Sequence, residues 1–190
     1  SSYKKALKLN PNHTDAYNNM GTALYDQGRF DEALNCYQKA VKLEPDFAQA
    51  HFNLGNALKK TGALKDAIKS YKVCLVINPA DAEVLVNYGD TLYEYGCLSK
   101  AIDAYARAVK TNPNFAIAQK NMDNAIEKKA KIDRLVSTYA RLAQLEIGSA
   151  EIISFTGALL YKNGHINAAI DNYKQAIKIK PDYAEAYFNM

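Results

Sequence analysis

The chain has 190 residues, of which 48% are hydrophobic and 23% are charged, as in an ordinary folded domain. Nine glycines and five prolines are few for a loop-rich β-domain and favour long helices joined by short turns. The net charge of +4 is too small to indicate a nucleic-acid partner, and no apolar run approaches the roughly 20 residues that span a membrane. Three scattered cysteines predict free thiols and a cytoplasmic location.

A period of 34 residues runs through the whole chain and is carried by three residue types. The prolines are Pro11, Pro45, Pro79 and Pro113, with Pro181 two periods further on. The tyrosines are Tyr3, Tyr37, Tyr71, Tyr105, Tyr139 and Tyr173. The glycines form two series, Gly21, Gly55, Gly89 and Gly157, then Gly28, Gly62, Gly96 and Gly164. A period of this length predicts a solenoid of helical hairpins that bury their apolar faces against one another.

In chain order, the period divides the sequence into a single array, residues 1–190. Residues 1–13 predict the second helix of a truncated repeat, and residues 184–190 predict a truncated first helix. Regular repeats are expected at 14–47, 48–81, 82–115 and 150–183, with a degenerate repeat at 116–149. Solenoids usually carry polar caps, so an array that starts and stops inside a repeat is expected to be a fragment of a larger protein. Its uncapped ends are expected to permit self-association.

The segment from Phe47 to Pro79, FAQAHFNLGNALKKTGALKDAIKSYKVCLVINP, shows how one repeat is built. Apolar residues recur at helical spacing on both sides of Gly62, which permits the left-handed conformation that ends the first helix. Pro79 ends the second helix. This segment resembles the tetratricopeptide-repeat family, and the resemblance extends over the whole chain. It implies an all-α fold, a right-handed superhelix of helix-turn-helix repeats whose first helices line a concave, peptide-binding groove.

The repeat at 116–149 keeps the length of the others but loses most of their landmark residues. Asp123 replaces the first glycine, Ala130 the turn glycine, and Ile147 the proline. Two interpretations remain open, either a hairpin that turns near Lys129–Ile132 or one long helix without a breaker. The hairpin is favoured because Tyr139 keeps its register and the flanking repeats need a surface on which to stack. In that case Asp133 caps the second helix and Gly148 ends it.

Amide side chains recur at one position of the first helices and are the main candidates for binding a partner. An amide offers both a donor and an acceptor, so a ladder of amides can bind the backbone of an extended peptide. The ladder comprises Asn19, Asn53, Asn87 and Asn121, and further candidates one turn away are Asn56, Asp90 and Asn124. This ladder is similar to that in the repeat region of O-linked N-acetylglucosamine transferases, where it holds substrate proteins.

The sequence contains no motif that predicts catalysis or a cofactor. The three histidines, His13, His51 and His165, lie in different repeats, without ligands at metal spacing. No phosphate-binding glycine loop or nucleophile elbow occurs. The leading hypothesis is therefore a protein-binding module that is not an enzyme. The alternatives are a structural scaffold that assembles through its convex face or its ends, and the substrate-recognition arm of a glycosyltransferase.

Overall fold

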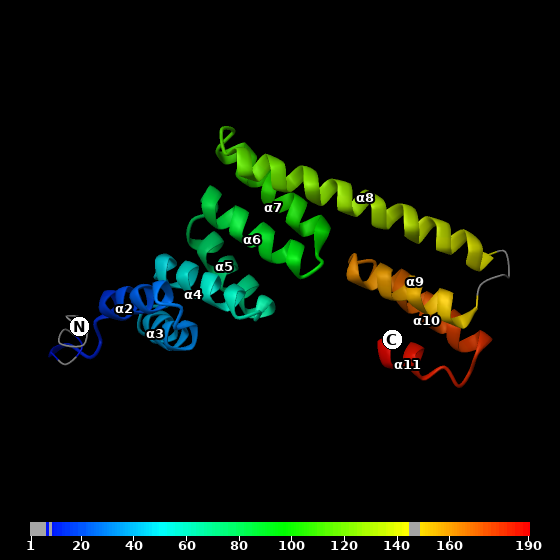
Figure 1. The fold of residues 1–190 in the computed structure, drawn as a ribbon, viewed down its shortest axis with the longest axis horizontal. Coiled ribbons are helices and arrows are strands. Elements are labelled where there is room, and N and C mark those ends of the chain that lie inside the picture. Colours follow the sequence, from blue (N-terminus) through cyan, green and yellow to red (C-terminus); the bar gives the residue numbers. More distant parts are fainter. Residues whose placement is uncertain (1–6, 8, 145–148) are drawn as a thin grey trace.

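The computed structural model describes residue 7 and residues 9–144 and 149–190, and every regular element in these ranges is an α-helix (Figure 1). The helices are α2 (Thr14–Asp26), α3 (Phe30–Leu43), α4 (Ala48–Lys60), α5 (Leu64–Ile77), α6 (Ala82–Glu94), α7 (Leu98–Thr111), α8 (Ala116–Gln144), α9 (Ala150–Lys162), α10 (Ile166–Ile179) and α11 (Ala184–Asn189). The all-α prediction is therefore confirmed. The predicted helix at residues 1–13 lies largely outside the described residues.

Four pairs of helices form tight antiparallel hairpins, α2–α3, α4–α5, α6–α7 and α9–α10. Each hairpin turns at a glycine with positive φ, for example Gly62 at +81°, as the sequence predicts. This conformation costs a glycine little because it lacks a Cβ atom. The second helix ends where a proline follows. Asn78, for example, is extended before Pro79, with φ −129° and ψ 91°.

A glycine of the first helix and a tyrosine of the second helix hold each hairpin closed. A Cβ atom added to Gly55 would lie 2.7 Å from Cε1 of Tyr71, which is far inside van der Waals contact. The other three hairpins repeat this contact, with corresponding distances of 2.7, 2.6 and 2.8 Å for Gly21, Gly89 and Gly157. The tyrosine rings are at most 2% exposed. Only glycine therefore fits opposite a tyrosine that packs in this way.

The hairpins stack so that each second helix packs on the first helix of the next hairpin. The largest apolar cluster runs from α5 to α8 and is centred on Tyr71, Leu85 and Tyr105. Two alanines of α8, Ala118 and Ala125, are fully buried in this cluster. The N-terminal half of α8 therefore belongs to the stack formed by α2–α7 (Figure 1).

The hairpin expected at 116–149 is wrong, because α8 runs without interruption for 29 residues. Its N-terminal half packs on α7, whereas its C-terminal half extends beyond the first stack and packs on α9 (Figure 1). The expected turn at Lys129–Ile132 lies in the middle of this helix, and Asp133 therefore does not cap a second helix. The predicted end at Gly148 lies outside the described residues.

Asp123 gives a physical reason for the open helix. A closed hairpin would bring Tyr139 opposite the position where the other hairpins have glycine, and a side chain there has no room. Ala130 also replaces the turn glycine and strongly favours helix. Two ion pairs span the expected turn, Lys129 to Asp133 at 2.6 Å and Lys131 to Glu127 at 2.6 Å. Pairs of this spacing stabilise continuous helix.

Among the described residues, no helix is both long enough and apolar enough to cross a membrane.

If Asp123 and Ala130 keep α8 open, replacing both with glycine will favour the closed hairpin. The variant Asp123→Gly/Ala130→Gly restores space for the tyrosine and lowers helix propensity, by about 1 kcal/mol at position 130 and by less at position 123, because aspartate is already a poor helix former. We expect a smaller radius of gyration than in the parent chain, measured by small-angle X-ray scattering.

The matched control is Asp123→Ala/Ala130→Gly, which removes the carboxylate but keeps a Cβ atom at position 123. This control should remain as extended as the parent chain. Equal compaction of both variants would show that the Cβ atom at position 123 does not hold the hairpin open.

Candidate binding groove

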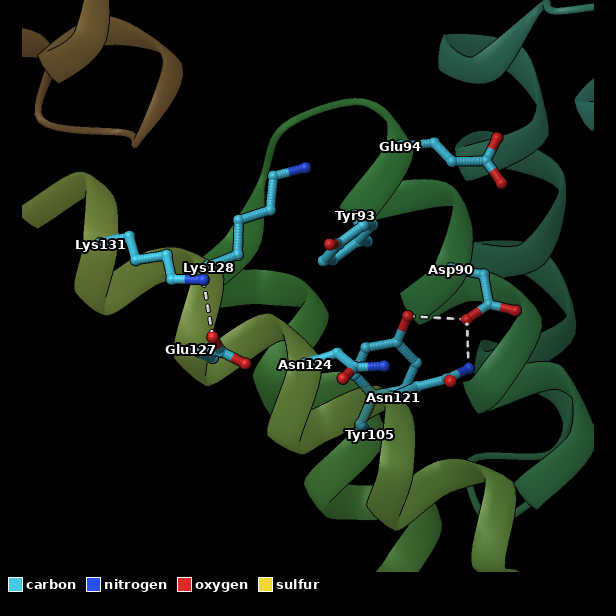
Figure 2. Close-up of a pocket in the computed structure, with 9 residues that line it drawn as sticks. All are labelled: Asp90, Tyr93, Glu94, Tyr105, Asn121, Asn124, Glu127, Lys128 and Lys131. Atoms are coloured by element: carbon cyan, nitrogen blue, oxygen red, sulfur yellow. Dashed lines mark hydrogen bonds and ion pairs between the residues drawn. The ribbon is translucent and has the colours of Figure 1, made fainter.

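The first helices α2, α4 and α6 and the N-terminal half of α8 lie side by side and form one face of the stack. Two hollows lie on this face. The first hollow, about 490 Å³, is lined by Tyr25, Phe52, Asn56, Lys59, Lys60, Glu83, Asn87 and Glu94. The second hollow, about 540 Å³, is lined by Asp90, Tyr93, Glu94, Tyr105, Asn121, Asn124, Glu127, Lys128 and Lys131 (Figure 2). Glu94 borders both hollows, so the two adjoin.

The candidate residues predicted from the sequence divide between these hollows. Asn56 and Asn87 line the first hollow, and the second hollow brings together three more, Asp90, Asn121 and Asn124. Asn19 is exposed on α2 and Asn53 is half-buried on α4, but neither lines these two hollows.

Several amides of the ladder bind other side chains of the protein. Asn53 donates from Nδ2 to Oδ1 of Asn18 at 2.9 Å, and its own Oδ1 accepts from Gln49 at 3.2 Å. Asn121 donates from Nδ2 to Oδ1 of Asp90 at 2.9 Å. The Asn53–Asn18 and Asn121–Asp90 bonds join neighbouring first helices, α4 to α2 and α8 to α6, whereas the bond from Gln49 lies within α4. The ladder therefore contributes to the stacking of the hairpins.

The packed tyrosines reach the face of the groove with their hydroxyl groups. Tyr71 donates to Oδ1 of Asn56 at 2.6 Å, and Tyr105 donates to Oδ1 of Asp90 at 2.7 Å. Burial raises the pKa of Tyr105 above its ordinary value, and the hydrogen bond to the Asp90 carboxylate raises this pKa further. The hydroxyl therefore remains protonated at neutral pH and donates to the carboxylate. These contacts orient Asn56 and Asp90 and use part of their bonding capacity.

Asp90 joins four helices. Its carboxylate accepts from Tyr105 of α7 and Asn121 of α8, and it lies 3.8 Å from the ammonium group of Lys59 on α4. Lys59 also pairs with Glu94 at 3.2 Å. Figure 2 shows the two bonds to Asp90 at the edge of the second hollow. This carboxylate is therefore central to the structure of the groove.

Other groups on the same face are more available to a partner. Asn124 makes no hydrogen bond within the described residues, and Asn87 donates only to the carbonyl of Glu83 in its own helix, at 3.0 Å. Lys128 lies over the ring of Tyr93, with its Nζ 4.2 Å from the centroid (Figure 2). This distance permits a cation–π contact. The second hollow therefore combines an available amide, an aromatic face and a cation.

Three charged residues of the hollows, Lys59, Lys60 and Glu94, were not predicted as candidates from the sequence. The signal that could have found them is the same 34-residue register, at the last turn of the first helices. Among the described residues, no group of three or more histidine, cysteine or acidic side chains could hold a metal ion.

Comparison with protein families identifies the repeat. Models described as TPR repeat or tetratricopeptide repeat match residues 2–35, 21–62, 48–81 and 157–190. The chain therefore carries tetratricopeptide repeats, and its fold is that of a tetratricopeptide-repeat solenoid. The region between residues 81 and 157, which includes α8, lies outside these matched ranges. No curated protein matches the sequence.

Solved structures of other proteins share this fold. YrrB, described as a TPR protein with an unusual peptide-binding site, is 22% identical, with a TM-score of 0.63 over 99% of this chain and 97% of YrrB. MamA is 24% identical, with a TM-score of 0.60 over 90% and 94%. The first TPR of Spaghetti (RPAP3), bound to the HSP90 peptide SRMEEVD, is 20% identical, with a TM-score of 0.60 over 62% and 93%.

We expect Asp90→Ala to destabilise the protein, because the Tyr105 hydroxyl and the Asn121 amide both lose their acceptor. A buried donor without a partner costs about 1–3 kcal/mol, which would lower the midpoint of urea unfolding measured by circular dichroism.

Asn124→Ala is the matched control from the same hollow, and it should change stability by less than about 0.5 kcal/mol. Equal midpoints for the two variants would contradict the structural role assigned to Asp90.

Proposed function

We propose that the chain is a protein–protein interaction module that binds an extended segment of a partner in the groove of its first helices. The observation that carries this proposal is the pair of adjoining hollows on that face, which share Glu94 and expose amide, aromatic and charged side chains. Together they offer a polar path across four first helices, α2, α4, α6 and α8.

The chemistry of the path suits a peptide backbone. An extended segment leaves one N–H and one C=O group per residue without intramolecular partners, and these need bonds when they are covered. The amides of Asn87 and Asn124 can each donate and accept. Tyr25 and Tyr93 supply aromatic surface, which is common in interfaces. YrrB, described as having an unusual peptide-binding site, and the first TPR of Spaghetti (RPAP3), which is bound to an HSP90 peptide, support the same use here.

A structural scaffold is the second candidate. One observation favours it, namely that Val76, on the second helix α5, is 81% exposed. An apolar side chain of this exposure on the second-helix face fits a contact with another protein. The predicted self-association through the ends of the array would serve the same function. A recognition arm of a glycosyltransferase would use the first-helix groove within a larger chain.

The test of the proposal is peptide selection followed by paired substitutions. Peptides of about 15 residues that bind the full chain are selected from a random display library, and their Kd is measured by fluorescence anisotropy. The variant Asn87→Ala/Asn124→Ala should weaken binding about tenfold or more, because two amides that meet the peptide backbone contribute ~1 kcal/mol each. Helicity should not change.

The second helices offer a closely matched control. Asn172 donates to the carbonyl of Ala168 at 2.9 Å, as Asn87 does to that of Glu83 at 3.0 Å. Asn35 is exposed without a hydrogen bond among the described residues, as is Asn124. Asn35→Ala/Asn172→Ala should therefore leave Kd unchanged. A loss of binding in this control alone would favour the scaffold, and a library without binders would contradict the groove.

A further inference from the structure

The last turn of the first helices carries charges whose sign alternates along the stack. Asp26 is the last residue of α2, Lys60 of α4 and Glu94 of α6, and Lys128 occupies the corresponding position of α8. Successive members are 34 residues apart, and all four side chains are exposed. At this one position of the repeat, the first helices therefore carry charges in the order negative, positive, negative, positive. We call these four residues the charge series.

The charge series follows the hollows of the groove. Lys60 and Glu94 line the first hollow, and Glu94 and Lys128 line the second. Asp26 follows directly after Tyr25, which lines the first hollow. A segment that runs along both hollows would therefore pass members of the series in order. In Figure 2, Glu94 and Lys128 lie on opposite sides of Tyr93.

Ion pairing within the protein does not account for the alternation. If the alternation served to tie neighbouring hairpins together, Lys60 would pair with Asp26 or Glu94. Neither pair forms, and the bridge between α4 and α6 uses Lys59 instead. The Glu94 side chain remains 48% exposed even with this bridge. Lys128 makes a cation–π contact with Tyr93 rather than an ion pair. Asp26 and Lys60 form no ion pair among the described residues, and Glu94 and Lys128 stay exposed beside their partners, so the series remains accessible to a partner.

The spacing of the series fits an extended peptide. The axes of packed helices lie about 8–10 Å apart. An extended chain in the polyproline II conformation rises about 3.1 Å per residue with three residues per turn, so every third side chain lies on the same face. Three residues of the peptide therefore span one step of the series. A shift of the peptide by one step would place like charges opposite each other at every member. Alternation of sign therefore specifies the register of the peptide as well as attracting it.

We propose that the groove selects an extended peptide whose charged side chains recur at every third residue with alternating sign. Basic side chains of the peptide face Asp26 and Glu94, and acidic side chains face Lys60 and Lys128. This inference rests on the proposed function, since it specifies the peptide that the first-helix groove accepts.

Two synthetic peptides of identical composition test the inference. Each has charged residues at every third position, separated by serine and glycine. The alternating peptide has the order lysine, glutamate, lysine, glutamate, and the block peptide has lysine, lysine, glutamate, glutamate. Their Kd for the full chain is measured by fluorescence anisotropy at low and high salt. We expect the alternating peptide to bind about tenfold more tightly, and the difference to shrink as salt screens the charges.

A charge-swapped variant provides the control. Lys60→Glu/Glu94→Lys keeps the net charge of the chain but changes the series to negative, negative, positive, positive. The variant should therefore prefer the block peptide, a reversal of specificity that a loss of stability cannot produce. Thermal unfolding monitored by circular dichroism checks that the variant is folded.

The inference is overturned if the parent chain binds both peptides equally, if the variant keeps the parent's preference, or if neither peptide binds. In each of these cases the proposed function stands or falls separately, on the library selection and the asparagine substitutions. Random peptides that bind the groove without a charge pattern would preserve the proposed function and reject the charge series.

Discussion

The contact between a first-helix glycine and a second-helix tyrosine is the constraint on which the rest of the array depends. The tyrosine ring fills the space that the missing Cβ atom of the glycine leaves, so the two helices approach closely. In three hairpins the tyrosine hydroxyl donates a hydrogen bond to the residue that directly follows the glycine, namely Thr22, Asn56 or Asp90. One contact thus closes the hairpin and orients a side chain of the groove. The packing of the core and the chemistry of the surface are therefore coupled.

Replacement of one glycine changes the architecture of the array. Asp123 stands at the glycine position of α8, where a side chain cannot fit against a tyrosine packed as in the other repeats. The helix therefore continues, and its C-terminal half carries α9 beyond the first stack (Figure 1). The residue after Asp123 is Asn124, which keeps its amide available for the second hollow. The same substitution thus ends the first stack and leaves the last part of its groove open.

The sequence was sufficient to predict the all-α fold and the turns at Gly62 and its equivalents, because these depend on local periodicity and on the conformations that single residues permit. It was not sufficient to choose between a hairpin and a long helix at 116–149. That choice depends on whether the side chain of Asp123 has room, which is set by the distance between the two helices of a closed hairpin. Likewise, the 34-residue register predicted that Asn53 lies on the face of the first helices. It could not show that the Asn53 amide binds Asn18 of the neighbouring helix.

Some polar residues of the groove are bonded within the fold and others are exposed, and this difference indicates where along the groove a partner would bind. Asn53 and Asn121 hold neighbouring helices together, and Asp90 joins four helices, so their bonding capacity is largely used. Residues nearer the C-terminal ends of the first helices, among them Lys60 and Lys128, are instead exposed around the hollows. A binding surface must keep groups that the fold does not use. We therefore propose that a partner contacts Asn87, Asn124 and these charged ends rather than Asn53 and Asn121.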